Sequence, residues 1–214
     1  DPSYFIGGKA LNLESSLYAG AGNVCVVEGD EYDSAFFAKT PKFHFYKPDC
    51  LIVTSLEFDH ADIYSSLEDI EREFSTLVES VPENGSIWIC LDDQNLSKLF
   101  SQWQRLARAD VKSYGFDLEA DLRLLATSNS DSLKLVFEEK EYDFIPPIAG
   151  RHNAQNAAAV ISVLCSLGVK VEEALSAVQG FKGVARRLQL RADRGQIKLI
   201  EDFAHHPTAL KTTL

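Results

Sequence analysis

The alternation of apolar, β-branched segments with amphipathic helical segments is the feature that most restricts how this chain can fold. Residues 23–28, 50–60 and 86–91 each have the pattern of a short buried strand. Helical patterns follow the second and third of these strands, at 65–85 and 96–109. Because parallel strands need a crossover between them, and a helix is the usual one, this order predicts an α/β fold with a mainly parallel sheet flanked by helices.

The helix expected at 65–85 carries signals for both of its ends. Either member of the pair Ser65 and Ser66 can cap the first turn, where the acidic residues that follow are also favoured. Pro82 cannot continue a helix, so we expect the helix to end before it.

The periodicity changes after residue 109. Three segments of short alternating pattern follow one another: 110–117, 121–129 and 132–148. We interpret them as a small antiparallel β insertion that spans residues 110–145. Helical patterns return at 153–168 and 170–181, a strand is expected at 197–203, and 205–214 starts another helix.

The charge and the hydropathy pattern exclude several classes of protein. The chain has 214 residues and a formal net charge of −11, which argues against nonspecific nucleic-acid binding because that needs a basic face. Apolar runs all fall short of the roughly 18 residues of a membrane span, so we expect no membrane partner. The first ten residues lack the charged and apolar regions of a signal peptide, which favours a cytoplasmic protein.

The cysteines and the lack of methionine lead to two further expectations. Cys25, Cys50, Cys90 and Cys165 are far apart, and each lies in or beside an apolar run. We interpret them as reduced core thiols and not as disulfides or zinc ligands. Because the chain starts at Asp1 and contains no methionine, we expect that it is not a whole open reading frame: either it is a segment of a longer protein, or some of its residues are missing from the sequence.

Acidic and histidine side chains follow the predicted strands. Glu28, His60 and Asp92 each come just after a strand, and the ligands of parallel sheets bind beyond the carboxyl ends of strands. A shared site is one interpretation, and ordinary polar loops are the other. The acidic run 28–33 is likewise either a solvated loop or a Mg²⁺ site, since Mg²⁺ prefers oxygen ligands and takes one or two protein carboxylates. Imidazole is a less usual ligand for this ion.

Two amides mark the start of the helix at 153–168. Asn153 follows His152 at a loop-to-helix junction, and Asn156 lies about one turn further in. An Asn at this place is either a helix cap or a ligand contact. Two amides on one turn can read the edge of an adenine, because each offers a donor and an acceptor.

Basic and acidic groups near the end of the chain form another candidate cluster. Three arginines are close together: Arg186, Arg187 and Arg191. In an acidic chain they are either phosphate or carboxylate partners or members of surface salt bridges. Asp202 can bond a ribose hydroxyl, and His205 and His206 can bind metal, contact phosphate or cap a helix. The chain contains no G-x-x-x-x-G-K-[ST] phosphate loop.

Five segments, in this order, resemble the motifs of the Mur ligase family, the ATP-dependent amide ligases of peptidoglycan assembly. They are VVEGDEYD (26–33), TSLEFDHAD (54–62), GRHNAQNAAAV (150–160), GVARRLQLR (183–191) and DFAHHPT (202–208). The resemblance covers nearly the whole chain and weakens in the β insertion. It implies the fold of the family's central domain, similar to a P-loop NTPase but here without the P-loop. It also implies a central ATP-binding domain at 1–185, followed by a linker and the beginning of a C-terminal domain at 186–214.

The resemblance implies ATP and Mg²⁺ as cofactors. Glu28 and His60 match the glutamate and the histidine that hold Mg²⁺ between ATP and the acyl substrate. Asn153 and Asn156 match the amides near the adenine, and His152 is expected at the same ATP-binding place.

Three residues near the end of the chain also match functional positions of the family. Arg187 matches an arginine that contacts the nucleotide phosphates, and Asp202 matches an acid that binds the ribose. His205 lies in the segment that approaches the γ-phosphate when the domains close. We therefore expect Arg187 and His205 to serve catalysis.

By the same resemblance, the reaction has two steps and small-molecule partners. The carboxylate of UDP-N-acetylmuramate attacks the γ-phosphate of ATP, and an amine then displaces phosphate from the resulting acyl phosphate. DEYDSAFF, LEFDHADIY and EDFAHHPTAL look most like the branch of cell-wall recycling, whose amine is the tripeptide L-Ala-γ-D-Glu-meso-diaminopimelate. A sibling branch adds L-alanine with similar motifs, so the acceptor stays open. We expect a monomer.

The chain departs from the family pattern, and rival functions stay open. The family's UDP-binding domain, its phosphate loop and most of its C-terminal domain are missing. There is also no lysine between Lys47 and Lys98 to carry the carbamate that several members use. One rival is a metal-dependent phosphohydrolase built from Asp59, His60, Asp62 and the histidine pair at 205–206. Another is a nucleotide-binding module without catalysis.

Overall fold

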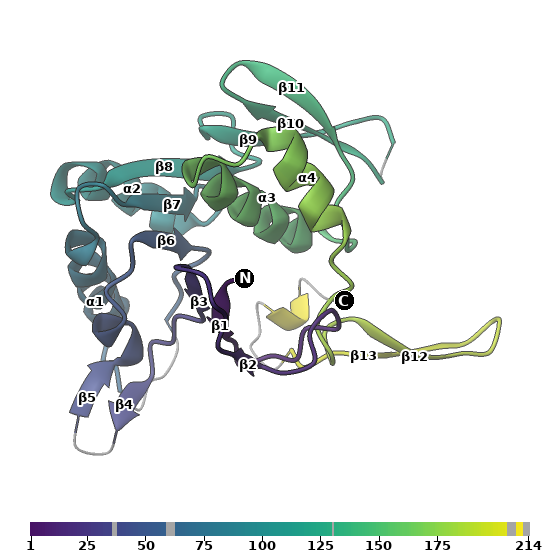
Figure 1. Ribbon diagram of the computed structural model, residues 1–214, viewed down its shortest axis with the longest axis horizontal. Helices are drawn as coiled ribbons and strands as arrows, with labels where there is room; N and C mark the ends of the chain where they lie inside the picture. The colour runs from purple at the N-terminus through teal and green to yellow at the C-terminus, as the bar shows by residue number, and fades with distance from the viewer. Residues whose placement is uncertain (36–37, 59–62, 130, 205–208, 212–214) are drawn as a thin grey trace. The chain divides into compact units, whose positions relative to one another are not determined.

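The structure, a computed structural model, describes residues 1–35, 38–58, 63–129, 131–204 and 209–211. The chain forms two compact units, one from 29 to 179 and one from the two ends, 1–28 with 180–214. Each unit has its own sheets (Figure 1). The expected boundary near residue 185 concerns the domains of a longer protein, and it stays a prediction.

The larger unit is built on a six-stranded sheet with the strand order β11-β10-β9-β8-β7-β6. The strands are β6 (Cys50–Val53), β7 (Ser86–Cys90), β8 (Asp110–Gly115), β9 (Leu122–Ala126), β10 (Leu133–Phe137) and β11 (Lys140–Phe144). The pairs β6–β7, β7–β8 and β8–β9 are parallel, whereas β10 pairs antiparallel with both β9 and β11. The predicted α/β fold, with a mainly parallel sheet and a small antiparallel part, is confirmed.

The assignment of residues 110–117 to the antiparallel insertion is wrong. β8 pairs in parallel with β7, from Ser86 opposite Asp110 to Cys90 opposite Tyr114. The helix α2 (Gln94–Leu106) lies between the two strands in the sequence and provides the crossover that a parallel pair needs. The antiparallel part of the sheet therefore consists of β9, β10 and β11.

The strand before His60 is shorter than its pattern suggests. β6 ends at Val53, which lies opposite Ile89, and residues 54–58 are not in a strand. The side chain of Asn95, in the first turn of α2, donates to the Leu56 carbonyl at 2.8 Å. This carbonyl therefore has a side-chain partner, and the apolar residues beyond Val53 do not extend the sheet.

Helices cover both faces of the six-stranded sheet (Figure 1). α1 (Leu67–Ser80) joins β6 to β7 and α2 joins β7 to β8, and because such crossovers are right-handed, both lie on one face. α3 (Arg151–Ser166) packs against the parallel strands on the other face, and α4 (Val171–Gln179) packs against α3. These helices were each expected from the periodicity of the sequence.

The ends of α1 follow the local signals of the sequence. Ser66 is the cap, because its hydroxyl accepts the Asp69 backbone N–H at 3.4 Å. The Asp69 carboxylate accepts the backbone N–H of Ser66 at 3.1 Å, which completes a capping box. Val81 is the C-cap, directly before Pro82.

Two tryptophans mark the cores on the two faces of the sheet. The indole of Trp88, in β7, is almost fully buried and donates to the Ser166 hydroxyl of α3 at 2.7 Å. The indole of Trp103, in α2, is fully buried and donates to the Ser75 hydroxyl of α1 at 2.9 Å. Both indole N–H groups thus keep a hydrogen-bond partner inside the protein, as buried donors should.

The smaller unit contains a three-stranded sheet and a hairpin. The sheet has the order β2-β1-β3, with β1 (Ser3–Phe5) parallel to β3 (Cys25–Val27) and antiparallel to β2 (Leu17–Tyr18). β12 (Gln189–Asp193) and β13 (Lys198–Glu201) form the antiparallel hairpin. The strand expected at 197–203 is thus confirmed, although it ends at Glu201.

The expectation of a buried strand before Glu28 is wrong. The side chains of Val24 and Val26 are about half exposed, and Cys25 is exposed as well. Strands of two or three residues bring too few neighbouring side chains together to cover this sheet. Of the expected core thiols, all four are free, but Cys90 is the buried one, while Cys50 and Cys165 are half-buried.

The remaining elements of the larger unit precede β6. β4 (Asp33–Ala35) pairs antiparallel with β5 (Ala38–Pro41), and a 3-10 helix, η1 (Lys42–Phe45), follows. Among the residues that the structure describes, no helix combines the length and the apolar character that crossing a membrane requires.

Candidate functional site

The first turn of α3 presents the two predicted amides on one side of the helix. The N-cap is Gly150, with a φ of 110°, so the helix starts at Arg151, two residues earlier than its pattern suggests. Asn153 and Asn156 are three residues apart and therefore lie on neighbouring positions of one helix face. Asn156 is exposed, while His152 and Asn153 are half-buried.

The amide of Asn153 has a defined orientation. Its Nδ2 donates to the carbonyl of Ala149 at 2.7 Å, and because a carbonyl can only accept, the nitrogen must face Ala149. The Oδ1 atom then points the other way as an acceptor. Asn153 is thus not a helix cap, since a cap accepts from backbone N–H groups. The cap interpretation of this residue is therefore wrong, and the ligand contact stays a prediction.

Glu28 follows β3 in the smaller unit, and its side chain forms a hydrogen bond with the backbone of a glycine. Its carboxylate accepts the backbone N–H of Gly7, and its own N–H donates to the Phe5 carbonyl at 3.1 Å. Glu28 is exposed, so its remaining lone pairs face solvent. Gly7 suits this contact, because a Cβ there would lie 2.8 Å from Glu28 Oε2.

The structure does not describe His60, the residue that was predicted to bind a metal ion together with Glu28. His60 lies outside the described residues, as do Asp59 and Asp62, so the Glu28–His60 pair stays a prediction. β3 pairs with β1 and β6 with β7, so the strands before Glu28 and His60 belong to different sheets. In the described ranges, no group of three or more His, Cys, Asp and Glu side chains is arranged to hold a metal ion.

Asp30, in the acidic run after Glu28, forms an ion pair within the protein. The Asp30 carboxylate pairs with Lys42 Nζ at 2.7 Å and also accepts the Tyr32 backbone N–H at 2.9 Å. The hydrogen bond that Lys42 donates to Asp30 raises the pKa of Lys42 above its ordinary value. Asp30 therefore serves a structural ion pair in this structure, and the metal role of Glu28 stays a prediction.

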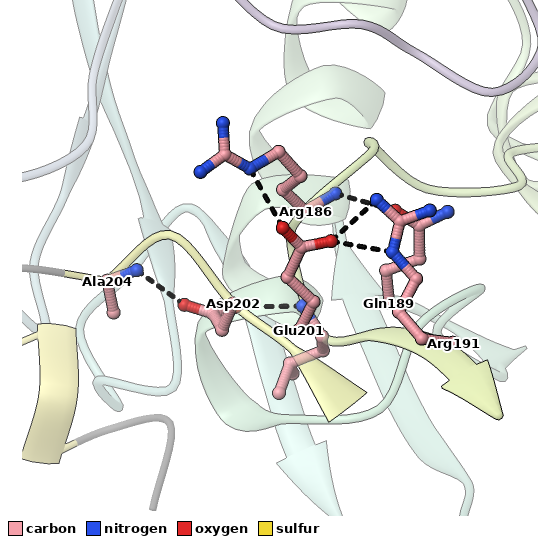
Figure 2. Close-up of polar contacts among 7 residues, drawn as sticks. Arg186, Gln189, Arg191, Glu201, Asp202 and Ala204 are labelled. Atoms are coloured by element: carbon pink, nitrogen blue, oxygen red, sulfur yellow. Dashed lines mark hydrogen bonds and ion pairs between the residues drawn. The ribbon is translucent and has the colours of Figure 1, made fainter. Parts of the chain in front are cut away.

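A cluster of ionic contacts surrounds Glu201 at the end of β13 (Figure 2). The Arg186 Nε donates to one oxygen of Glu201 at 3.1 Å, and Arg191 donates to the other at 2.6 Å. The hydrogen bond from Arg191 lowers the pKa of Glu201 below its ordinary value. Sequence reasoning missed Glu201, because its two arginine partners are 15 and 10 residues away in the sequence and no local pattern marks the contact.

The three candidate arginines are not equivalent. Arg186 and Arg191 form the salt bridges that were the alternative interpretation for them. Arg187 lies with its guanidinium 5.9 Å from the centre of the Phe203 ring, and within the described part of the chain no ion pair involves it. Arg187 is therefore the one arginine of the three that forms no ion pair with Glu201.

Asp202 uses its carboxylate to hold the local backbone. Its Oδ2 accepts the Leu188 N–H at 2.8 Å and its Oδ1 accepts the Ala204 N–H at 2.7 Å (Figure 2). These two bonds do not test the predicted ribose contact of Asp202, which stays a prediction. His205 and His206 lie outside the described residues, and their predicted roles stay predictions.

Comparison with known proteins supplies the class of this chain. Residues 10–164 match the family described as the Mur ligase middle domain. The chain is 36% identical over 215 residues to the UDP-N-acetylmuramate–L-alanyl-γ-D-glutamyl-meso-2,6-diaminoheptandioate ligase of Escherichia coli K12, which covers 100% of this chain and 46% of that protein. It is 32% identical over 218 residues to the UDP-N-acetylmuramate–L-alanine ligase of Streptomyces avermitilis, covering 100% of this chain and 45% of that protein.

Solved structures agree with this assignment. One similar structure is UDP-N-acetylmuramate:L-alanyl-γ-D-glutamyl-meso-diaminopimelate ligase from Neisseria meningitides, with a TM-score of 0.75 and 30% identity over 86% of this chain and 59% of that one. Another is a murein peptide ligase from Psychrobacter arcticus, with a TM-score of 0.74 and 28% identity over 100% of this chain and 48% of that one. The chain belongs to the Mur ligase family, and it spans about half the length of the curated relatives it matches.

Proposed function

We propose that this chain is the nucleotide-binding part of a longer ATP-dependent amide ligase. The enzyme joins the tripeptide L-Ala-γ-D-Glu-meso-diaminopimelate to UDP-N-acetylmuramate in peptidoglycan recycling. Membership of the Mur ligase family supports the reaction type, and the first turn of α3 is the observation that carries the nucleotide role. We place the ATP-binding domain at residues 1–185 and the beginning of the ligase domain at 186–214, in a cytoplasmic monomer.

In this proposal the start of α3 reads the adenine. Asn153 offers Oδ1 as an acceptor because its Nδ2 is held by Ala149, and an acceptor suits the exocyclic amine of adenine. Asn156, exposed one turn further on, can supply both a donor and an acceptor to the same base edge. His152, half-buried beside Asn153, contributes to the same contact surface.

The remaining roles belong to the charged groups. Arg187 contacts the nucleotide phosphates, since Glu201 forms ion pairs with Arg186 and Arg191 and not with Arg187. Asp202 accepts a ribose hydroxyl, and His205 approaches the γ-phosphate during catalysis. Arg187 stabilises the negative charge that develops on the transferred phosphoryl group.

Glu28 and His60 are the residues that would hold Mg²⁺. The exposed carboxylate of Glu28 fits this ion, which takes one or two protein carboxylates and keeps several waters. The ion would supply charge stabilisation on the phosphate oxygens. The protein groups then orient the muramyl carboxylate for attack on the γ-phosphate, with ADP as the leaving group. The amine of the tripeptide attacks the acyl carbon of the resulting acyl phosphate and displaces inorganic phosphate as the amide bond forms.

A second candidate function is the addition of L-alanine in place of the tripeptide. The relatives favour it as well, because the Streptomyces avermitilis protein, at 32% identity, is named as an L-alanine ligase. The phosphohydrolase alternative rests on Asp59, His60 and Asp62, and nothing among the described residues favours it.

The acceptor assay decides between the two ligase functions. The complete protein is incubated with ATP, Mg²⁺ and UDP-N-acetylmuramate, and phosphate release and the ligated product are measured with tripeptide or with L-alanine. We expect the tripeptide to be the better acceptor and phosphate release to require both substrates. Preference for L-alanine would establish the second function, and phosphate release without any acceptor would contradict both.

A further inference from the structure

We propose that Asp92 is a positioning residue for the adenine-reading turn of α3, and that it thereby sets how well the enzyme distinguishes ATP from nucleotides with another base. This inference rests on the proposed function, because it assumes that Asn153 and Asn156 contact the base. Asp92 itself is not expected to touch the nucleotide. It acts through the two residues of α3 that it binds, Arg151 and Gln155.

The carboxylate of Asp92 joins the ends of two strands to the start of α3. Asp92 follows β7, and its Oδ2 accepts the backbone N–H of Phe116, just past β8, at 2.8 Å. The same oxygen accepts Gln155 Nε2, and Oδ1 accepts Arg151 Nη2 at 3.3 Å. All three partners are donors, so an acceptor-only carboxylate is the group that satisfies them together. The side chain is only 13% exposed, which limits competition from water.

The surroundings of Asp92 are shaped to keep it in this place. Gly115, at the end of β8, has a φ of +142°, and a Cβ there would lie 2.7 Å from Asp92 Oδ2. The guanidinium carbon of Arg151 lies 3.8 Å from the centre of the Phe116 ring. Arg151 is therefore held by an ion pair and by a cation–π contact at once. The three contacts reinforce one another at a single point on α3.

The first turn of α3 needs such an anchor because its own cap is weak. Gly150 is the N-cap and makes no side-chain cap hydrogen bond. The usual local bond that fixes a helix start is therefore not present at this helix. Arg151 and Gln155 lie on either side of Asn153 in the sequence, and Gln155 directly precedes Asn156. A shift of this turn moves both amides relative to a bound base, and small displacements of contact groups have large effects on recognition.

Two substitutions of Asp92 should give graded effects. In Asp92→Asn, the remaining oxygen can keep the bonds to Phe116 and Gln155, but the new amide nitrogen faces the Arg151 guanidinium, donor against donor. In Asp92→Ala, all three bonds are lost. Asp121→Asn is a matched control, because Asp121 Oδ2 likewise accepts a backbone N–H, that of Ser113 in β8 at 2.8 Å, and also the Ser113 hydroxyl at 2.6 Å.

The experiment measures base discrimination by the complete protein. The kcat/KM for ATP is divided by the kcat/KM for inosine triphosphate, whose base has an oxygen where adenine has its exocyclic amine. This ratio does not depend on the fraction of folded enzyme, so loss of stability alone cannot change it. We expect the ratio to fall roughly two- to tenfold in Asp92→Ala, the range for one hydrogen bond, less in Asp92→Asn, and not at all in Asp121→Asn.

The outcomes separate this inference from the proposed function. A wild-type enzyme that uses both nucleotides equally would contradict base reading by α3 and the Asp92 inference with it. A wild-type enzyme that discriminates, with an unchanged ratio in Asp92→Ala, would overturn the Asp92 inference alone. Should Asp92→Ala fail to fold, Gln155→Leu removes one arm of the same contact, and an unchanged ratio in that variant would overturn the inference equally.

Discussion

At the scale of single residues, the contacts inside the protein decide which polar groups are left for a ligand. Glu201 forms ion pairs with Arg186 and Arg191 but not with Arg187, which leaves the charge of Arg187 for another partner. Asn153 has its nitrogen committed to Ala149, and so its oxygen is the atom that can read a base. The neighbours of a residue therefore restrict which of its polar atoms can contact a ligand. The structure shows these restrictions, whereas the sequence motifs do not.

Cys90 gives a residue-scale prediction about pH. Burial raises the pKa of its thiol from 9.0 to about 11. The native state then holds a proton that the unfolded state releases, so this stabilisation is complete below pH 9 and is lost as the pH rises toward 11. Between pH 8 and 10, we expect the free energy of unfolding to fall by about 1 kcal/mol more in the wild type than in Cys90→Ala.

Chemical denaturation of both proteins at the two pH values checks this. Cys25→Ala is the control, because the Cys25 side chain is exposed, and it should behave as the wild type does. An identical pH dependence in wild type and Cys90→Ala would contradict the assignment of a buried, protonated thiol.

At the scale of elements, features with local causes could be predicted from the sequence. The ends of α1 depend on a cap and a proline within the segment itself, and they are found where expected. The pairing of β8 depends on which strand lies beside it, which no local pattern encodes, and it was assigned wrongly. The prediction that β3 is buried was wrong for a related reason, because the burial of a strand depends on how much neighbouring structure covers it.

In the candidate site, too, features with local causes could be predicted from the sequence and features that depend on distant residues could not. The positions of Asn153 and Asn156 on one helix turn follow from their spacing, and the structure confirms it. The roles of Asp92 and Glu201 depend on partners that are 59 and 10 or more residues away in the sequence. Such contacts appear only when the chain is folded. The sequence therefore placed Asp92 after a strand without predicting its partners, and it did not point to Glu201.

The cap of α1 gives an element-scale prediction. Ser66→Ala removes the hydroxyl that accepts the Asp69 N–H and leaves that donor without its partner. The free energy of unfolding should fall by about 1 kcal/mol, the usual effect of losing an N-cap. Ser65→Ala is the matched control, since Ser65 is exposed and contributes its backbone N–H to Asp69 but is not the cap. Equal stability of the two variants in urea denaturation would show that the capping box does not stabilise α1.

At the scale of the whole molecule, the chain contains a core but lacks one part of a phosphate site. The sheet of β6 to β11 with its helices buries two tryptophans and a cluster of other large apolar side chains. The sequence, however, contains no G-x-x-x-x-G-K-[ST] loop, whose backbone N–H groups and lysine cradle phosphates. The groups predicted for the nucleotide are therefore mainly those for the base, the ribose and one phosphate contact.

We therefore expect the isolated 214-residue chain to fold without acting on ATP. Two amides and one arginine should bind ATP with a Kd on the order of millimolar. Calorimetry with ATP and Mg²⁺, beside a phosphate-release assay, measures both properties on the purified chain. Micromolar binding or clear turnover would mean that these 214 residues contain a phosphate site that the motifs do not reveal.

The central claim is that this chain provides the adenine and metal contacts of a Mur ligase. A crystal structure of the complete protein with ADP and Mn²⁺, with the ion located by its anomalous scattering, tests it most directly. The account predicts the adenine edge against Asn153 and Asn156, and a manganese peak within bonding distance of Glu28 and His60. Adenine bound elsewhere, or a manganese ion that touches neither Glu28 nor His60, would contradict it.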